Sequence, residues 1–383
     1  MGFDFAVLGA TGMQGKIVTK DLLKNGYSVL LCGRDKSRIL HLLKNYKKTG
    51  FEYVDLRDIK KTAGVIKKSG AKVVVNCAEG DWNLNALKAC IKANASLVDL
   101  GSDIEMTKKQ LDYDKILKRK NLTHITGCGS VPGVGNVMLR YAARKFDSIQ
   151  NIEVGFVWDS NMKKFVVPFS ILSIIEEFAH PAPIVENGKF KHKVPLDNVI
   201  EIKRRAIEKQ KAFLAEHSET YTFYKYFKRM GLKNIHFYSG FPNHSYNMIM
   251  AMIDLGLGSK IPLTICKDSV RPVDFLTQVL KRLGYPPGYT EKENLWVFIH
   301  GKKKGRKKEV QMECLVFPLK GWEDAGCNID TGMPASIMGQ MIKENVITEK
   351  GAFAPEGVVP CEPFFKELRK RKMVVLENGR RVN

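Results

Sequence analysis

The feature that most constrains this chain is a glycine-rich turn near its amino terminus. An apolar strand candidate, Phe3–Leu8, runs into Gly9, Gly12 and Gly15, and an amphipathic helical pattern follows directly. A strand, a tight turn and a helix in this order can cradle a dinucleotide pyrophosphate. Gly9 would permit the turn, Gly12 would admit a phosphate close to the backbone, and Gly15 would let the helix pack on the strand. The position of the turn favours cofactor binding over a turn without a ligand.

Strand and helix patterns alternate through the first 127 residues. Five further strand candidates follow the first, and the most continuous apolar one is Lys72–Asn76. This alternation predicts an α/β fold with a doubly wound parallel sheet, a Rossmann domain, over residues 1–127. Its strands would all end at one edge, where ligands bind. The residues expected along that edge are Gly9, Arg34, Asp55, Asn76, Asp99 and Gly127.

The end of the second strand bears on the choice of dinucleotide. NAD sites carry an acidic residue there, whereas this chain has Arg34 followed by Asp35. Arginine can pair with a 2′-phosphate, which favours NADP, while Asp35 leaves NAD possible unless it only caps the next helix. Asp55 could likewise contact the cofactor or only cap the helix that follows it. The predicted cofactor-binding set is Gly9, Thr11, Gly12, Met13, Gly15, Arg34, Asp55, Leu56, Asn76, Cys77 and Ala78.

The regular alternation of strand and helix patterns ends at a second glycine-rich stretch, Gly127–Gly135, which predicts a hinge between domains. Strands and helices are mixed beyond it, which predicts a second, α+β domain over residues 128–330. Residues 331–383 include a helical pattern, Pro334–Lys343, whose apolar face is expected to pack back on the first domain. The candidates in the second domain are the strands Asn151–Trp158, Asn234–Ser239, Asn294–His300 and Glu309–Phe317, and the helices Phe169–Ala179, Tyr221–Arg229, Asn247–Asp254 and Val273–Leu283.

Composition excludes several classes of protein. The 383-residue chain carries a formal charge of +22, with lysine and arginine clusters at Lys302–Lys304 and Arg369–Lys372. No aromatic residues are interleaved with these clusters, so we expect solvated faces rather than a nucleic-acid surface. No apolar run reaches the ~18 residues of a membrane span. The eight scattered cysteines lack metal-like spacing, which predicts reduced thiols, no metal site and a cytoplasmic enzyme.

Three stretches together resemble the saccharopine dehydrogenase-like family, which includes saccharopine reductases and lysine 6-dehydrogenases. They are the turn Gly9–Gly15, the crossing Gly127–Asn136, and the segment from Thr331–Ala335 to Gly357–Glu362. Residues Ile174–Lys189 are similar to the lysine 6-dehydrogenase side of the family. The resemblance implies a Rossmann domain, an inserted domain that binds substrate and forms a homodimer, and a helix returning to the first domain. It also implies hydride transfer between a nicotinamide and an amine-bearing carbon, as in lysine metabolism.

Oxidising an amine needs a proton acceptor and cations that hold a substrate carboxylate. Asp99, at the end of the fifth strand, is the nearest acidic candidate, although it could instead cap a helix. The resemblance implies that His217 and Glu219 face the cleft, and on a strand the two would share one side. Ser130 is predicted to contact the substrate at the hinge. Arg140 is predicted to reach the substrate carboxylate, with a surface arginine as the alternative.

The sequence thus predicts an NAD(P)-dependent oxidoreductase that acts on the C–N bond of an amino acid. One alternative is reductive coupling of an aldehyde with a diamine, by a relative of carboxynorspermidine synthase. Another is a non-catalytic cofactor-binding protein that uses its basic charge to bind nucleic acid. Ser130 and the segment Trp158–Asn161 depart from the family pattern, and they leave the substrate open.

Overall fold

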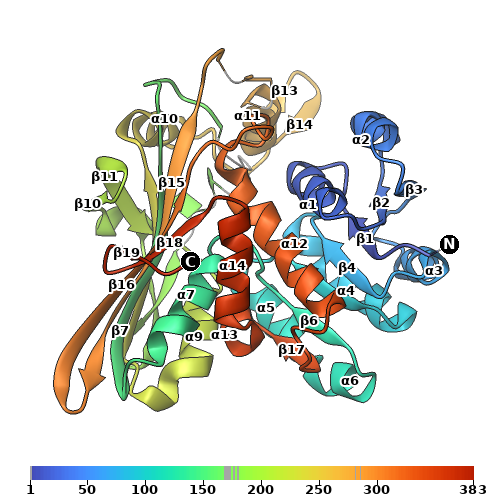
Figure 1. Cartoon of the computed structure of the whole chain (residues 1–383). Coiled ribbons are helices and arrows are strands. Elements are labelled where there is room, and N and C mark those ends of the chain that lie inside the picture. The colour runs from blue at the N-terminus through green and yellow to red at the C-terminus, as the bar shows by residue number, and fades with distance from the viewer. Residues whose placement is uncertain (1, 168–173, 176, 179–180, 281, 285) are drawn as a thin grey trace.

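The computed structural model describes residues 2–167, 174, 175, 177, 178, 181–280, 282–284 and 286–383. Two large β-sheets organise the molecule, one in each half, and helices of the carboxyl-terminal segment lie between the halves (Figure 1). Among the described residues, none of the helices combines the length and the apolar character needed to cross a bilayer.

The amino-terminal half contains a seven-stranded parallel sheet with the strand order β17-β6-β5-β4-β1-β2-β3. The predicted Rossmann sheet is therefore confirmed. Its central strand β4 reads Val-Val-Val-Asn and is buried throughout, as expected for a β-branched strand covered on both faces. The bounds are β1 (Phe5–Leu8), β2 (Val29–Gly33), β3 (Thr49–Tyr53), β4 (Val73–Asn76), β5 (Ser96–Asp99), β6 (Thr123–Ile125) and β17 (Gly351–Phe353).

Helices connect these strands, and side-chain caps start two of them. Asp58 accepts from the main-chain N–H of Lys61 at the start of α3, and Asp103 accepts from that of Met106 at the start of α5. Two short helices, α5 and α6, connect β5 to β6. The bounds are α1 (Met13–Lys24), α2 (Leu40–Asn45), α3 (Ile59–Ser69), α4 (Asn83–Ala93), α5 (Ile104–Leu111), α6 (Asp114–Arg119), and the 3₁₀ turns η1 (Lys36–Ile39) and η2 (Gly80–Trp82).

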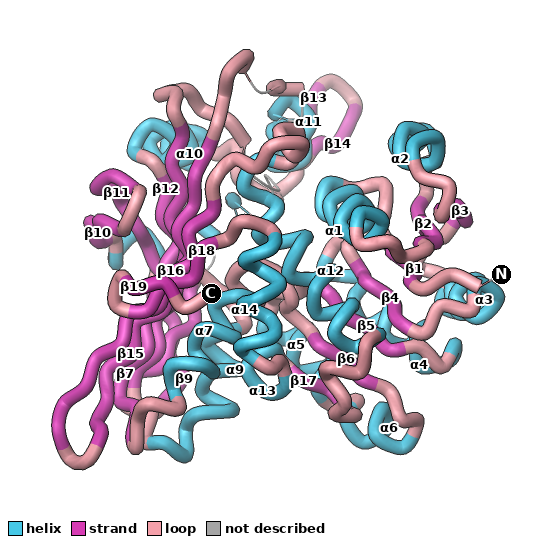
Figure 2. The backbone as a smooth tube through the Cα atoms, viewed as in Figure 1, coloured by secondary structure: helices cyan, strands magenta, loops and turns pink. Residues whose placement is uncertain are grey.

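The second half is built on a ten-stranded mixed sheet with the main order β10-β11-β12-β7-β15-β16-β18-β19 and with β8 and β9 beside β12. All four strand predictions in this region are confirmed. Strands β15 and β16 pair as a hairpin with a basic turn, seen as a long magenta pair in Figure 2. The bounds are β7 (Ser148–Ser160), β8 (Ala182–Glu186), β9 (Lys189–Lys193), β10 (Ile200–Arg204), β11 (Ile207–Leu214), β12 (Asn234–Phe241), β15 (Glu291–Lys303), β16 (Arg306–Val316), β18 (Val374–Glu377) and β19 (Arg380–Arg381).

Several shorter elements of this half were not predicted, namely the strands β8 to β11 and the hairpin of β13 (Leu263–Ile265) and β14 (Asp268–Val270). The helix predicted over residues 169–179 lies largely outside the described residues. The remaining helices and turns are α7 (Val134–Ala143), η3 (Pro195–Asn198), α9 (Glu219–Phe227), η4 (Lys228–Met230), α10 (Asn243–Asp254), α11 (Pro272–Leu280), η5 (Gly326–Asn328), α12 (Ile329–Lys343), α13 (Pro355–Val358) and α14 (Cys361–Lys370).

The carboxyl-terminal segment joins both halves. The predicted return of a helix to the first domain is confirmed, because α12 packs against α1 so closely that a Cβ on Gly332 would lie 2.5 Å from the side chain of Ile17. The same segment also supplies β17 to the Rossmann sheet and β18 to the second sheet. These two strands were not predicted. They show that residues 331–383 form part of both sheets and do not pack on the first domain alone.

Candidate active site

The glycine turn has the close backbone packing that the sequence predicts. Gly9 has a φ of +71°, and a Cβ there would lie 2.6 Å from the main-chain nitrogen of Ala78. A Cβ on Gly15 would lie 2.2 Å from the carbonyl oxygen of Gly9, so only glycine lets α1 approach β1 this closely. Thr11 in the turn packs against Gly33 at the end of β2.

The first turn of α1 is open to an anion. Its N-cap is Gly12, which has no side chain to accept the free N–H groups, and the first turn holds no acidic residue. Met13 is 44% exposed beside it. Free N–H groups at a helix N-terminus, together with the helix dipole, suit a phosphate. The turn therefore fits a dinucleotide pyrophosphate held by Gly12, Met13 and their neighbours.

The end of β2 presents a cation rather than a free carboxylate. Asp35 accepts hydrogen bonds from the N–H (2.9 Å) and the hydroxyl (2.6 Å) of Ser37, so it caps η1. Asp55 is paired with Arg57, whose Nε lies 3.0 Å from both carboxylate oxygens. Arg34 is exposed and has no hydrogen-bonded or ion-paired side-chain partner within the described residues.

The predicted residues after β3 and β4 shape the turns beside the glycine loop. Asn76 is fully buried, and its amide donates to Asn83 at 2.7 Å. Leu56 is also buried and belongs to the apolar core. The side chains of Asn76 and Leu56 thus have structural positions, and their predicted contact with the cofactor stays a prediction. Cys77 and Ala78 are partly exposed and lie against the turn at Gly9.

Asp99 is not placed to meet a substrate, contrary to its predicted catalytic role. The side chain is fully buried, and Oδ1 accepts from the N–H of Gly101 and the hydroxyl of Thr126, while Oδ2 accepts from Gln110 at 2.6 Å. His124 lies beside it, equally buried, and burial lowers the pKa of His124. This network fixes the crossing after β6, so Asp99 is a structural carboxylate.

The crossing itself brings Ser130 to the amino end of α12, where the hydroxyl of Thr331 lies 3.3 Å from that of Ser130. Arg140, on α7, donates to the carbonyl oxygen of Glu356 at 2.8 Å. The guanidinium group thus ties α7 to α13, an arrangement that does not support the predicted contact with a substrate carboxylate. Cys128 is fully buried, and burial raises the pKa of its thiol well above the usual range.

A buried acidic cluster lies where β11 leads into α9, and we call Glu177, His217, Glu219 and Glu356 the acidic cluster. His217 Nδ1 lies 3.5 Å from Glu219, and His217 Nε2 lies 3.9 Å from Glu177. The two residues predicted at this position, His217 and Glu219, are therefore close together, but Glu219 opens a helix and does not lie on a strand. The ring of His217 stacks on Phe237.

The acidic cluster contains three glutamates and one histidine. Burial lowers the pKa of His217, but the carboxylates of Glu177 and Glu219 outweigh it and raise the pKa to about 9. His217 is therefore a cation at neutral pH, between two acids. Glu219 is fully buried, and neither of its oxygens has a hydrogen-bond donor within the described residues. Such oxygens are costly unless a donor reaches them.

Glu356 links the cluster to the Rossmann edge. Its Oε2 accepts from the amide of Asn136 in the first turn of α7 at 2.7 Å. Burial raises the pKa of Glu356 to about 7, and the charge of Glu219 acts in the same direction, while the bond from Asn136 opposes it. Because β17 runs parallel to β6, Glu356 follows the carboxyl end of a strand of the same sheet that holds Gly9.

Sequence reasoning missed Glu177, Glu356 and Asn136 as site residues. Asn136 stands out in the sequence only as the end of the crossing motif, and Glu356 directly precedes Gly357, where the last motif begins. The available signal was the position of Glu356 between two recognised motif segments. Its strand β17 has only three residues, which give too short a pattern to be recognised. Within the described residues, no group of His, Cys, Asp and Glu side chains is arranged to hold a metal.

Comparison with known families defines the class of protein. Residues 5–125 match the saccharopine dehydrogenase NADP binding domain, and residues 119–374 match the saccharopine dehydrogenase C-terminal domain. The chain therefore belongs to the saccharopine dehydrogenase family. It is an oxidoreductase of that family with a domain for a nicotinamide dinucleotide, and the name of the domain indicates NADP.

Individual relatives are similar over most of the chain. Carboxynorspermidine synthase of Vibrio alginolyticus is 25% identical over 339 residues, covering 84% of this chain and 81% of the relative. The Vibrio cholerae carboxynorspermidine synthase is also 25% identical, over 346 residues, with the same coverage. Among solved structures, apo saccharopine dehydrogenase (L-Glu forming) from Saccharomyces cerevisiae matches with a TM-score of 0.77 and 11% identity over the whole of both chains. This last likeness shows the fold.

Proposed function

We propose that the protein is an NADP-dependent oxidoreductase that acts on the C–N bond of an amino-acid substrate. The observation that carries the proposal is the acidic cluster, buried beside the carboxyl edge of the Rossmann sheet. Glu219 offers two buried oxygens without donors among the described residues, and a substrate ammonium group would supply the missing hydrogen bonds. A dinucleotide at the glycine turn accepts or delivers the hydride.

The remaining residues would hold the amine and move its proton. The ion pair with His217 fixes the carboxylate of Glu219, so that it binds the amine in a defined orientation. Glu356 can take up or release a proton near neutrality, because its pKa lies at about 7. Its hydrogen bond from Asn136 orients the carboxyl group toward the cluster. We assign Glu356 as the acid or base and Glu219 as the amine-binding residue.

NADP is the proposed cofactor form. Arg34 stands exposed at the end of β2, where a 2′-phosphate would lie, and the adjacent Asp35 is occupied by Ser37. A planar guanidinium group can bind a phosphate through two parallel hydrogen bonds, whereas a capped carboxylate has little capacity left for a ribose hydroxyl.

A second candidate activity is reductive coupling of an aldehyde with a diamine. It is favoured by the similarity to two carboxynorspermidine synthases and by the excess of carboxylates over cations in the acidic cluster. Glu177 and Glu219 outnumber the single cation His217, and Glu356 adds a third negative charge above its pKa of about 7, so the cluster suits a substrate with more than one ammonium group.

One assay separates these candidates. NADPH oxidation is followed by absorbance with an amino-acid semialdehyde plus a series of diamines, and NADP⁺ reduction is followed with lysine and with saccharopine. Turnover with the amino acids supports the first activity, and turnover only with aldehyde plus diamine supports the second. The Glu219→Gln variant should lose most of its turnover in either case. Absence of hydride transfer with every pair would refute both.

We further propose a homodimer that forms through the second sheet, and a cytoplasmic location. The resemblance to the family supports the dimer, and all eight cysteines are free thiols, as a reducing compartment would keep them. Light scattering of the purified protein tests the dimer: a mass of one chain at micromolar concentration would refute it.

A further inference from the structure

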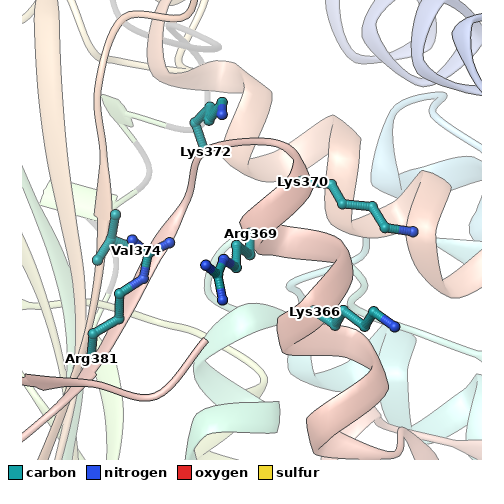
Figure 3. A pocket seen from close by; sticks show the side chains of 6 residues that line it. All are labelled: Lys366, Arg369, Lys370, Lys372, Val374 and Arg381. Carbon is teal, nitrogen blue, oxygen red and sulfur yellow. The ribbon is translucent and has the colours of Figure 1, made fainter.

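A basic hollow lies on the surface away from the acidic cluster. Its volume is about 560 Å³, and five cations and one apolar residue line it (Figure 3). The helix α14 and the β18–β19 hairpin form its sides, with Arg369 on the helix and Arg381 on the hairpin. We use the name basic hollow for the set Lys366, Arg369, Lys370, Lys372, Val374 and Arg381.

Three of the five cations of the hollow have no acidic partner among the described residues. Lys370 and the adjacent, buried Arg371 both pair with Glu367. Lys366, Arg369 and Lys372 contact no carboxylate in the part of the chain that the structure describes. Like charges that gather without counter-charges repel one another, and an anion would relieve that repulsion.

The position of some of these cations at the carboxyl end of α14 accounts for part of the positive charge, but not for all of it. Cations are favoured near a helix carboxyl end, which accounts for Arg369 and Lys370 in that turn. Lys366 lies a turn earlier, and Arg381 comes from a separate element. Arg381 uses its Nε to donate to the main-chain oxygen of Asn383 at 2.7 Å.

Lys372 stands where a glycine would be less strained. The N–H of Met373 donates to the carbonyl of Leu368, and the N–H of Lys372 donates to that of Arg369, the two bonds of a Schellman motif. Lys372 is the left-handed residue of that motif, with a φ of 63°. Glycine normally takes this position because it lacks a Cβ. The chain therefore keeps a lysine at a strained position on the rim of the hollow, and strained residues of this kind often serve a ligand.

We propose that the basic hollow binds a small anion with several phosphate groups. Its volume lies within the range of small-molecule sites, and five of its six lining residues, which come from two elements, are cationic. Within the described residues, Val374 is its only apolar lining residue and no aromatic side chain lines it, so it has no platform for stacking a nucleobase. The ligand is thus recognised through its phosphates. The proposal is independent of the proposed oxidoreductase activity.

The test is calorimetric titration of the full-length protein with inorganic triphosphate at low ionic strength. We expect saturable binding at one site per chain. The Lys372→Gly variant should bind about three- to tenfold more weakly, since one exposed charge-assisted contact is lost. The same variant should keep or raise the melting temperature, because glycine relieves the left-handed strain. Weaker binding without lower stability separates a ligand contact from a structural role.

Lys304→Gly provides a matched control. Lys304 also has a positive φ, of 49°, and lies in the basic turn of the β15–β16 hairpin, so the substitution removes the same charge and the same kind of strain elsewhere. It should leave triphosphate affinity unchanged. The proposal fails if both variants weaken binding equally, if only Arg34→Ala weakens it, or if no saturable binding occurs. Tight binding of a single-stranded oligonucleotide that both lysine variants weaken equally would also overturn the proposal. It would show that anions bind through the overall positive charge of the protein and not at one site.

Discussion

At the scale of single residues, hydrogen bonding distinguishes two equally buried acids of this protein. Asp99 and Glu356 are both carboxylates near the carboxyl edge of one sheet, and both are almost inaccessible to solvent. Asp99 is surrounded by donors that consume its oxygens. Glu356 keeps one oxygen without a donor within the described residues, and its proton is retained to a pH of about 7. The proton-transfer group is therefore Glu356 in our proposal.

The raised pKa of Glu356 predicts a specific dependence of stability on pH. The folded protein holds this proton up to a pH of about 7, whereas the unfolded chain releases it above about 4.3. Folding therefore becomes less favourable as the pH rises between those values, by on the order of 3 kcal/mol in total. Glu356→Gln removes this term. Its melting temperature, relative to the parent protein, should rise between about pH 4 and pH 7 and level off above, and a difference that stays constant with pH would contradict the prediction.

Arg34 carries the prediction about the cofactor form. Replacing it with alanine removes the exposed cation at the end of β2 without disturbing a hydrogen bond or an ion pair within the described residues. We expect NADPH to bind about 10- to 100-fold more weakly, and NADH affinity to change little, because only the 2′-phosphate contact is lost. Calorimetric titration with both nucleotides measures the difference. Equal losses for the two would show that Arg34 does not read the 2′-phosphate.

At the scale of elements, the glycine turn, which we expect to hold the cofactor phosphates, also sets the packing of α1 on β1. Gly15→Ala would place a methyl group 2.2 Å from the carbonyl oxygen of Gly9, so α1 must shift away from β1. We expect a loss of about 1–3 kcal/mol in unfolding free energy and a marked loss of NADPH affinity. Gly64→Ala in α3 is the control, because a Cβ at Gly64 would meet no other described atom within 4 Å. It should stabilise the protein by about 0.5–1 kcal/mol in urea denaturation.

The elements that could be predicted are those with long, regular patterns. The continuous run of β4 and the alternating residues of β15 and β16 identify buried and half-buried strands directly. The short strand β17 has no such pattern, and its pairing with β6 depends on contacts 226 residues apart, as between Thr123 and Glu349. The location of Glu356 follows from that pairing, so no local rule could have placed it in the site.

At the scale of the whole molecule, a buried ion pair joins the carboxyl-terminal segment to α1, the helix that follows the glycine turn. Arg371, after α14, donates to both oxygens of Asp21 on α1, at 2.9 and 2.7 Å. Ser336 and Gln340 of α12 donate to the same carboxylate. Residues from opposite ends of the chain thus meet at one charge, near the carboxyl end of α1.

Arg371→Met would leave Asp21 buried without its cation. We expect a loss of about 3–5 kcal/mol in unfolding free energy, because an uncompensated buried charge is costly. The double variant Asp21→Leu/Arg371→Met removes both charges and should lose clearly less than the sum of the two single variants. Urea denaturation of the four proteins measures this coupling. Additive losses would mean that the pair does not act as a unit.

The seventh strand of the Rossmann sheet has a consequence for how the protein is made. A ribosome releases β1 to β6 long before it has translated β17, and during that interval β6 is an open sheet edge. The acidic cluster also lacks Glu356 until then. A nascent chain, or a product of premature termination before residue 351, has neither β17 nor Glu356 and cannot assemble the acidic cluster. If the acidic cluster is the site, as we propose, catalytic competence is acquired late in synthesis, only once the segment that carries β17 and Glu356 has left the ribosome.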